Sequence, residues 1–124
     1  MGTLTATLIL KDSTTFSDEL NFSTSKAITT AAPAQMLKLV SVGTGAAEVL
    51  YADSGSDGTA FVYIKNANTS NSHSVDIRTN NGNNTYGTLD NGEFAFIPID
   101  TNEGVEVIGV GGTVSVEFAF FTKA

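Results

Sequence analysis

The chain of 124 residues contains no cysteine, no tryptophan, two prolines and one histidine. Without cysteine, disulfides, thiol catalysis and Cys-based zinc sites are excluded. The single histidine, His73, cannot form a histidine-based metal cluster within one chain. A chain of this size must then be held by packing, by oligomerisation or by a hard cation, and oligomerisation is the favoured expectation.

Basic residues are also scarce. Six Lys and Arg stand against thirteen Asp and Glu, which gives a formal net charge of −7. This balance argues against a function that neutralises phosphates, so neither nucleic acid nor an anionic membrane is an expected partner. The segment Met1–Leu10 lacks a basic start and a long apolar run, so we expect no secretory or membrane-spanning segment there.

The residues that are abundant indicate strands and turns. A hydrophobic content of 41% over 124 residues is enough for one core, so residues 1–124 are expected to form a single domain. Twelve glycines separate short runs of Val, Ile, Phe and Thr. About nine such runs predict an all-β fold, an antiparallel two-sheet sandwich of jelly-roll or related Greek-key type. A Greek-key barrel is the alternative.

Period-two alternation places the clearest strands. In Thr3–Leu10 the alternation predicts one buried face, and in Thr113–Thr122 it assigns Val114, Val116, Phe118 and Phe120 to the core. Further strands are expected over Glu19–Ser23, Met36–Val42 and Thr59–Lys65. The intervening segment Thr24–Gln35 is consistent with an extended crossover or with one helical turn, and the sequence does not decide between them.

The most conspicuous stretch is Ser74–Ile99. It reads as a short alternating strand, an Asn/Gly-rich loop over Asn80–Thr88 and an apolar strand over Glu93–Ile99 that begins after an Asp-Asn-Gly turn. Pro98 has no N–H to donate, so this last strand is predicted to lie at a sheet edge. The residues expected at the exposed end of the domain are Asn80, Asn81, Asn83, Asn84 and Tyr86.

Some strands have apolar residues on both faces. Glu93–Ile99 carries phenylalanines on one face and isoleucines on the other, and Met36–Val42 has apolar residues on both faces. A monomeric sandwich should leave one face of each sheet polar, so the excess predicts burial against other copies or another protein. We expect a homo-oligomer, with a trimer favoured. The candidate interface residues are Phe94, Phe96, Ile97, Ile99 and Phe121.

Residues with catalytic or metal-binding potential are few. Asp53 and Asp57 have a spacing that could ligate calcium, but the remaining ligands of an EF-hand are missing, so an ordinary turn is favoured and no metal or cofactor is expected. Glu93 and Glu117 could form a carboxylate pair for glycoside chemistry. Outward positions on strands with core phenylalanines explain both glutamates better, so we do not expect an enzyme and assign no catalytic residue.

The tyrosines offer a binding alternative. Tyr51, Tyr63 and Tyr86 together with the Asn-rich loops could form a platform on which sugars stack. Packing in the core or at its rim is the favoured role for any one of these rings.

Two segments of the chain carry a family resemblance. The strand LDNGEFAFIPI and the closing strand VSVEFAFFTKA, in an acidic, cysteine-free, Ser/Thr/Asn/Gly-rich chain, resemble small virion structural proteins of tailed bacteriophages, especially capsid decoration (cement) proteins. The resemblance covers roughly residues 61–124. It does not extend to residues 1–33, which leaves open whether these form an extended N-terminal arm.

The resemblance implies a non-enzymatic jelly-roll or related sandwich, often trimeric. Such a protein is made in the cytoplasm of the bacterial host and sits on the capsid surface of the virion, where it binds the assembled lattice of the major capsid protein and stabilises it. The alternative function is a receptor- or carbohydrate-binding module of a phage tail or head fibre. That module would use Tyr86 and the neighbouring asparagines.

Overall fold

The computed structural model describes residues 1–15, 17–69 and 72–124. Within these ranges the chain forms antiparallel strands in two sheets, so the predicted all-β sandwich is confirmed. Sheet A has the order β1-β2-β9-β4-β7 and sheet B the order β3-β8-β5-β6. The strands are β1 (Gly2–Asp12), β2 (Leu20–Val42), β3 (Glu48–Tyr51), β4 (Thr59–Asn66), β5 (Ser74–Arg78), β6 (Thr85–Leu89), β7 (Phe94–Asp100), β8 (Val105–Val110) and β9 (Val114–Lys123).

The core lies between the two sheets and follows the alternation of the sequence. On β4, Ala60, Val62 and Ile64 are fully buried, because successive side chains of a strand point to opposite faces. β9 lies between β2 and β4, and its Val114, Val116 and Phe118 enter the same core, as predicted. The buried apolar residues also include Val42, Leu50, Val75, Ile77, Leu89, Ile99, Val105 and Val107.

β2 is longer than the sequence predicts. It runs without interruption from Leu20 to Val42, where separate short strands with an undecided segment between them are expected. Its first part pairs with β1 from Gly2↔Thr30 to Asp12↔Leu20, and its second part pairs with β9. The Ser, Thr and Ala residues of the undecided segment have no apolar period of their own, so pairing with β1 and, from Thr30 onward, with β9 defines them as strand.

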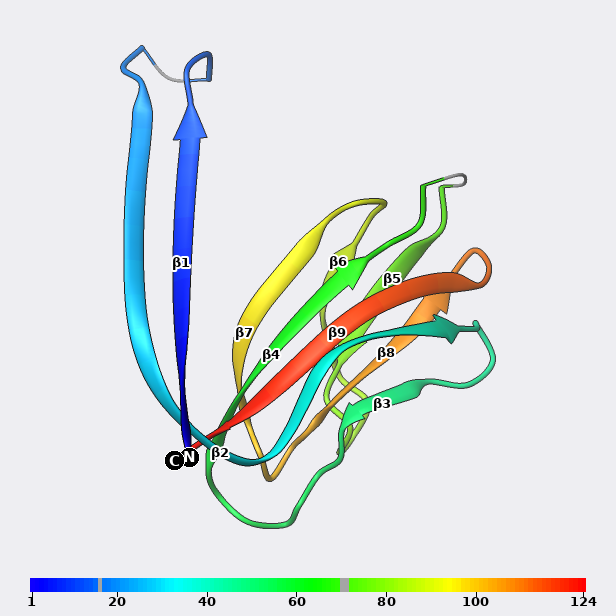
Figure 1. Cartoon of the computed structure of the whole chain (residues 1–124). Helices are drawn as coiled ribbons and strands as arrows, with labels where there is room; N and C mark the ends of the chain where they lie inside the picture. Colours follow the sequence, from blue (N-terminus) through cyan, green and yellow to red (C-terminus); the bar gives the residue numbers. More distant parts are fainter. Residues whose placement is uncertain (16, 70–71) are drawn as a thin grey trace.

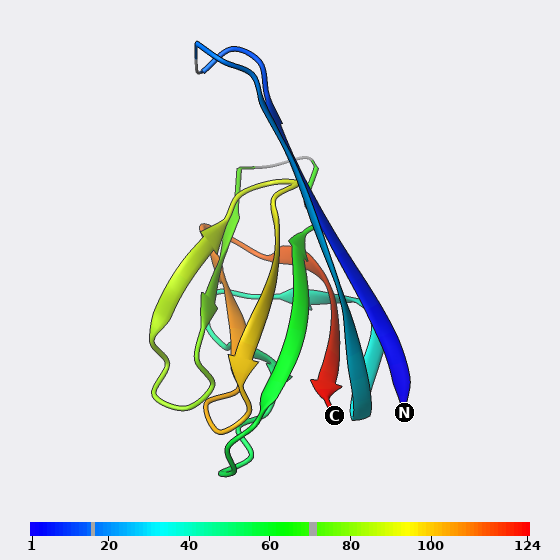
Figure 2. The ribbon, with the colours of Figure 1, turned by 90° about the vertical axis from the view of Figure 1, so that its left-hand side faces the viewer.

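The hairpin of β1 and the first part of β2 stands away from the rest of the molecule. We call residues 2–12 and 20–30 the arm. Its far end projects beyond the two sheets, while the N and C termini lie together at its base (Figures 1 and 2). There the backbone N–H of Ala124 donates to the carbonyl of Thr29 at 2.9 Å. The arm is therefore an extension of sheet A that leaves the sandwich.

The stretch 74–99 forms three strands. β5 and β6 pair with each other, and Val75↔Leu89 places two buried residues opposite one another. The predicted loop over Asn80–Thr88 is therefore wrong from Thr85 onward, because β6 begins there. β7 pairs with β4 at the edge of sheet A, which confirms the position predicted from Pro98. No helix in the described ranges is long and apolar enough to cross a membrane.

Candidate functional site: the outer face of sheet A

An aromatic cluster covers the face of sheet A that points away from sheet B. Strand pairing sets Tyr63 opposite Phe96, and Phe61 opposite both Phe121 and Pro98, so side chains from three strands share this face. The ring of Phe61 stacks on Phe96 with centroids 5.8 Å apart and an interplanar angle of 11°. An apolar surface thus forms on the side of the sheet where a monomeric sandwich carries polar residues.

Tyr63 adds one polar contact to this surface. Its hydroxyl donates to Oε1 of Glu117 at 3.1 Å. Burial of the ring, then the hydrogen bond and the negative charge of Glu117, raise the pKa of Tyr63 above its ordinary value. The tyrosine therefore stays a neutral donor and fixes the glutamate among the aromatic rings.

The arm continues the same face. Residues that pair across an antiparallel hairpin point to the same side, so the register Leu4↔Ile28 and Leu10↔Phe22 gathers these side chains on one side of the arm. We call this side the apolar face of the arm; its apolar members are Leu4, Ala6, Leu8, Leu10, Leu20, Phe22 and Ile28. The opposite side carries mainly Thr and Ser, with Ile9 as its one large aliphatic residue.

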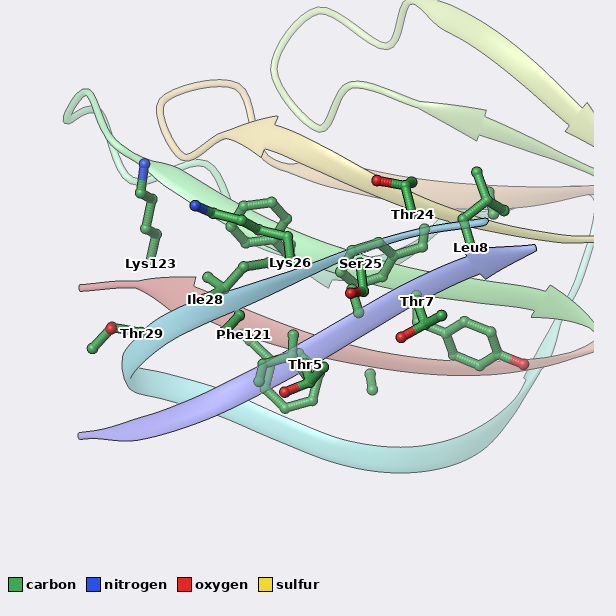
Figure 3. Close-up of a pocket in the computed structure, with 18 of the residues that line it drawn as sticks. Thr5, Thr7, Leu8, Thr24, Ser25, Lys26, Ile28, Thr29, Phe121 and Lys123 are labelled. Carbon is green, nitrogen blue, oxygen red and sulfur yellow. The ribbon is translucent and has the colours of Figure 1, made fainter. Parts of the chain in front are cut away.

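A groove of about 1020 Å³ lies between the base of the arm and the outer face of sheet A. Figure 3 shows side chains from β1 and β2 on one side of it, with Phe121 of β9 at the base. The lining is mostly apolar, and Lys26 and Lys123 are its charged members. Its principal residues are Leu4, Ala6, Leu8, Ile28, Leu37, Phe61, Tyr63, Phe94, Phe96 and Phe121.

Much of this surface is open to solvent. Phe94 is 64% exposed and Phe96 39% exposed, while Leu10 and Phe22 on the arm are 46% and 45% exposed. Met36, Leu37 and Leu39 of β2 are exposed as well. Contiguous apolar patches beyond a few hundred Å² mark sites of interaction in soluble proteins. The outer face of sheet A, the groove and the apolar face of the arm together make such a patch.

The candidate interface residues divide between the two faces of sheet A. Phe94, Phe96 and Phe121 lie on the outer face, and all three line the groove. Ile99 is buried in the core and Ile97 packs against it, so these two residues hold the sandwich together. β7 thus has one face that packs in the core and one face that is open to solvent.

The sequence did not identify the arm as part of this surface. Alternation in Thr3–Leu10 predicts one buried face, but Leu8 and Leu10 are about half exposed. The prediction of burial is wrong for these two residues because the hairpin leaves the sandwich there and no described segment covers this half of the apolar face, whereas Ile28 nearer the base is 7% exposed. The alternation of apolar residues is visible in the sequence, but it does not show whether the rest of the sandwich covers the apolar face.

The Asn-rich loop has a mixed role. Asn80 is partly buried: its side chain accepts from the N–H of Asp53 and donates to Oε1 of Glu106, both at 3.0 Å. Asn81, Asn83 and Asn84 are exposed in the turn before β6. Tyr86 is half exposed on β6, beside a hollow of about 410 Å³, and partial burial of its ring raises its pKa.

The acidic candidates are dispersed over different elements. Asp53 and Asp57 lie exposed in the loop before β4, and the described residues contain no group of three His, Cys, Asp or Glu side chains gathered as metal ligands. Glu93 accepts a hydrogen bond from the N–H of Asp90 in the turn before β7, whereas Glu117 accepts from the tyrosine of β4. Both glutamates thus have local hydrogen-bonding roles.

The remaining tyrosine belongs to the core. Tyr51 is buried, its ring lies edge-on to Phe120 with centroids 5.1 Å apart, and its hydroxyl lies 3.1 Å from Oγ1 of Thr122. It is therefore not available for a sugar platform with Tyr63 and Tyr86.

No protein-family model matches the chain, and no curated protein matches its sequence.

Proposed function

We propose that the protein is a non-enzymatic structural protein of a bacteriophage virion, a decoration (cement) protein that binds the assembled lattice of the major capsid protein. The observation that carries the proposal is the exposed apolar surface made by the outer face of sheet A and the arm. It agrees with the resemblance of strands β7 and β9 to such proteins.

The surface suits binding to a large partner. Phe94 and Phe96 stand on a rigid sheet whose inner face is locked in the core by Ile99. Aromatic side chains on a rigid element contribute strongly to interfaces, because they bury large areas at a low cost in conformational entropy. The arm adds an extended element that reaches away from the sandwich (Figure 2).

The mechanism needs no catalytic residue. A protein that binds the assembled lattice, but not its free subunits, stabilises the lattice by mass action. Many copies bind one shell at the same time, so the shell is stabilised even when the affinity of each single contact is low. On this proposal the protein is a homo-oligomer, with a trimer favoured, located on the capsid surface.

Co-sedimentation tests the proposal. Expanded shells are assembled from the major capsid protein of the same genome and centrifuged with the purified chain. The unmodified chain is expected to pellet at a saturable ratio, and Leu39→Asp, on the outer face of sheet A but outside the groove, is expected to reduce pelleting strongly. Val110→Asp is the matched control, because Val110 is also exposed but lies on sheet B. Failure of the unmodified chain to pellet with expanded shells would refute the proposal.

A receptor- or carbohydrate-binding function is the second candidate, and the hollow beside Tyr86 favours it. Tyr86 presents a half-exposed ring next to Pro98 and Thr79, close to the exposed turn that contains Asn81. Glycan-array binding that is lost in Tyr86→Ala, with no pelleting on shells, would support this function over capsid decoration.

A further inference from the structure

We propose that the groove receives the arm of a second copy of this chain. The tip of the incoming arm points toward the base of the receiving chain's own arm, which forms one wall of the groove. The inference deepens the self-association included in the proposed function, and it names the segment that enters and the site that receives it. The incoming arm occupies the groove, and Met36 and Leu39, which are exposed on β2 outside the groove, stay available to the capsid lattice. It can be tested without any capsid protein.

The first step concerns the stability of the arm. A two-stranded hairpin with one uncovered side is marginally stable in water. Leu10, Leu20 and Phe22 lie toward the tip, outside the lining of the chain's own groove, and each is between 39% and 46% exposed. Their apolar face needs an apolar partner, and the aromatic floor of the groove is a surface of that kind.

The charged side chains indicate the direction in which the arm enters the groove. Lys26 and Lys123 line the groove, and the one ion pair found among the described residues is Arg78–Glu106, so neither lysine is paired with a carboxylate there. The tip of the arm carries three carboxylates, Asp12, Asp18 and Glu19, beside one lysine, Lys11, so its net charge is negative. An arm that enters with its tip toward the base brings these acids to the lysines, where opposite charges favour association.

The chain's own arm cannot make this contact. Thr30 at the base of the arm pairs with Lys123, whereas Leu20 at its tip pairs with Asp12. About 33 Å of extended strand separates Leu20 from Thr30, at about 3.3 Å per residue. The tip of one chain therefore points away from its own Lys123, and only another chain can place its acids there.

The size of the contact is adequate. The arm has two strands that pair over the full 11 residues of β1. A standard stable interface uses roughly 20 to 30 residues on each side. Only one side of the arm, about half of its residues, faces the groove, so the lower end of that range is reached when two such contacts form in a reciprocal exchange. Reciprocal exchange gives a dimer and cyclic exchange gives a trimer, and both contain the same arm–groove contact.

Disulfide trapping tests the contact, because the chain has no cysteine of its own. Leu8→Cys and Phe96→Cys are prepared separately, mixed and oxidised, so that a heterodimeric disulfide reports contact between chains only. Ile9→Cys is the matched control: it is 57% exposed but lies on the opposite side of the arm. We expect several-fold more disulfide between Leu8→Cys and Phe96→Cys than between Ile9→Cys and Phe96→Cys. Equal yields from the two mixtures would overturn the inference.

Charge reversal gives a second readout by sedimentation velocity. The double variant Lys26→Glu, Lys123→Glu is expected to self-associate about tenfold more weakly than the unmodified chain, and so is Asp18→Lys, Glu19→Lys. Mixing the two variants restores complementary pairs and should restore part of the association. A monomeric unmodified chain at every concentration, or no restoration on mixing, would overturn the inference. Either result leaves the co-sedimentation of the chain with capsid shells as a separate question.

Discussion

Phe61 and Phe96 lie on neighbouring strands, and their rings stack at a centroid distance of 5.8 Å on the outer face of sheet A. The pair lies on the face that points away from the core. Together with Phe94 and Phe121, it makes the free face of the sheet aromatic. This arrangement is costly for an isolated monomer in water and favourable for a subunit in an assembly, because partner contact removes the rings from solvent.

Truncation of two residues of β7 should change the stability of the chain to very different extents. Ile99 is 8% exposed and belongs to the core, whereas Phe94 is 64% exposed on the outer face. For the dilute chain, Ile99→Ala is expected to lower the free energy of unfolding by about 2–5 kcal/mol, because it leaves a cavity. Phe94→Ala is expected to change it by less than about 0.5 kcal/mol. Urea unfolding monitored by circular dichroism measures both, and a large loss in Phe94→Ala would contradict the assignment.

The buried carboxylate of Glu106 accepts hydrogen bonds from two side chains. It accepts from Nε of Arg78 at 2.9 Å and from the side chain of Asn80 at 3.0 Å. Glu106→Ala leaves both donors unsatisfied, so we expect a loss of about 1–3 kcal/mol in the free energy of unfolding. Asp57→Ala, which removes an exposed carboxylate in a loop, is the control and should have little effect. Equal effects of the two substitutions in urea unfolding would contradict the role of Glu106.

Two glycines with positive φ allow the cost of backbone strain alone to be compared with the cost of strain plus a steric clash. Gly104 and Gly55 both have positive φ, at 66° and 72°. A Cβ at position 104 would meet the carbonyl oxygen of Tyr51 at 2.5 Å and the amide nitrogen of Asp53 at 2.6 Å, whereas position 55 is open. Gly55→Ala should cost about 1 kcal/mol, and Gly104→Ala should cost clearly more. Thermal melting of both variants checks the difference, and similar melting temperatures would show that position 104 is not closely packed.

Asp12 reports on the turn at the tip of the arm. Its Oδ1 accepts from the N–H groups of Thr15 and Thr14, both at 2.9 Å, and these bonds lower the pKa of Asp12 to about 2. Because the folded-state pKa lies below the unfolded value of about 3.9, the contribution to stability is present above that value and is lost as the pH falls through about 2. Titration of the side-chain carboxyl carbon by NMR measures this. An ordinary pKa would indicate that the tip turn does not form.

The sandwich could be predicted because its strands have local signals. β4 and β9 alternate buried with outward residues, and Pro98 marks the edge strand, so each feature can be read within one segment. The continuous β2 could not be predicted in the same way. Its segment of small polar residues becomes a strand through pairing with β1 and β9, which is a non-local interaction.

The candidate surface was predicted only in part. Phenylalanines at every second position of β7 indicated two apolar faces, and the structure separates the free face from the core face. The apolar face of the arm has the same alternation as a core strand, so the sequence cannot show that the hairpin leaves the sandwich. Likewise, the pairing of Arg78 with Glu106 joins residues far apart in sequence and has no local signal.

Calorimetry of expanded shells tests the central claim, that the exposed apolar surface binds and stabilises an assembled lattice. Shells of the major capsid protein are melted with increasing amounts of the purified chain. We predict that the melting temperature of the expanded shell rises with the concentration of the chain until the sites are full, because binding to the assembled state alone stabilises it. Leu39→Asp, which changes an exposed residue of the same face outside the groove, should require a much higher concentration for the same rise. A shell transition that does not move at any concentration of the unmodified chain would contradict the account.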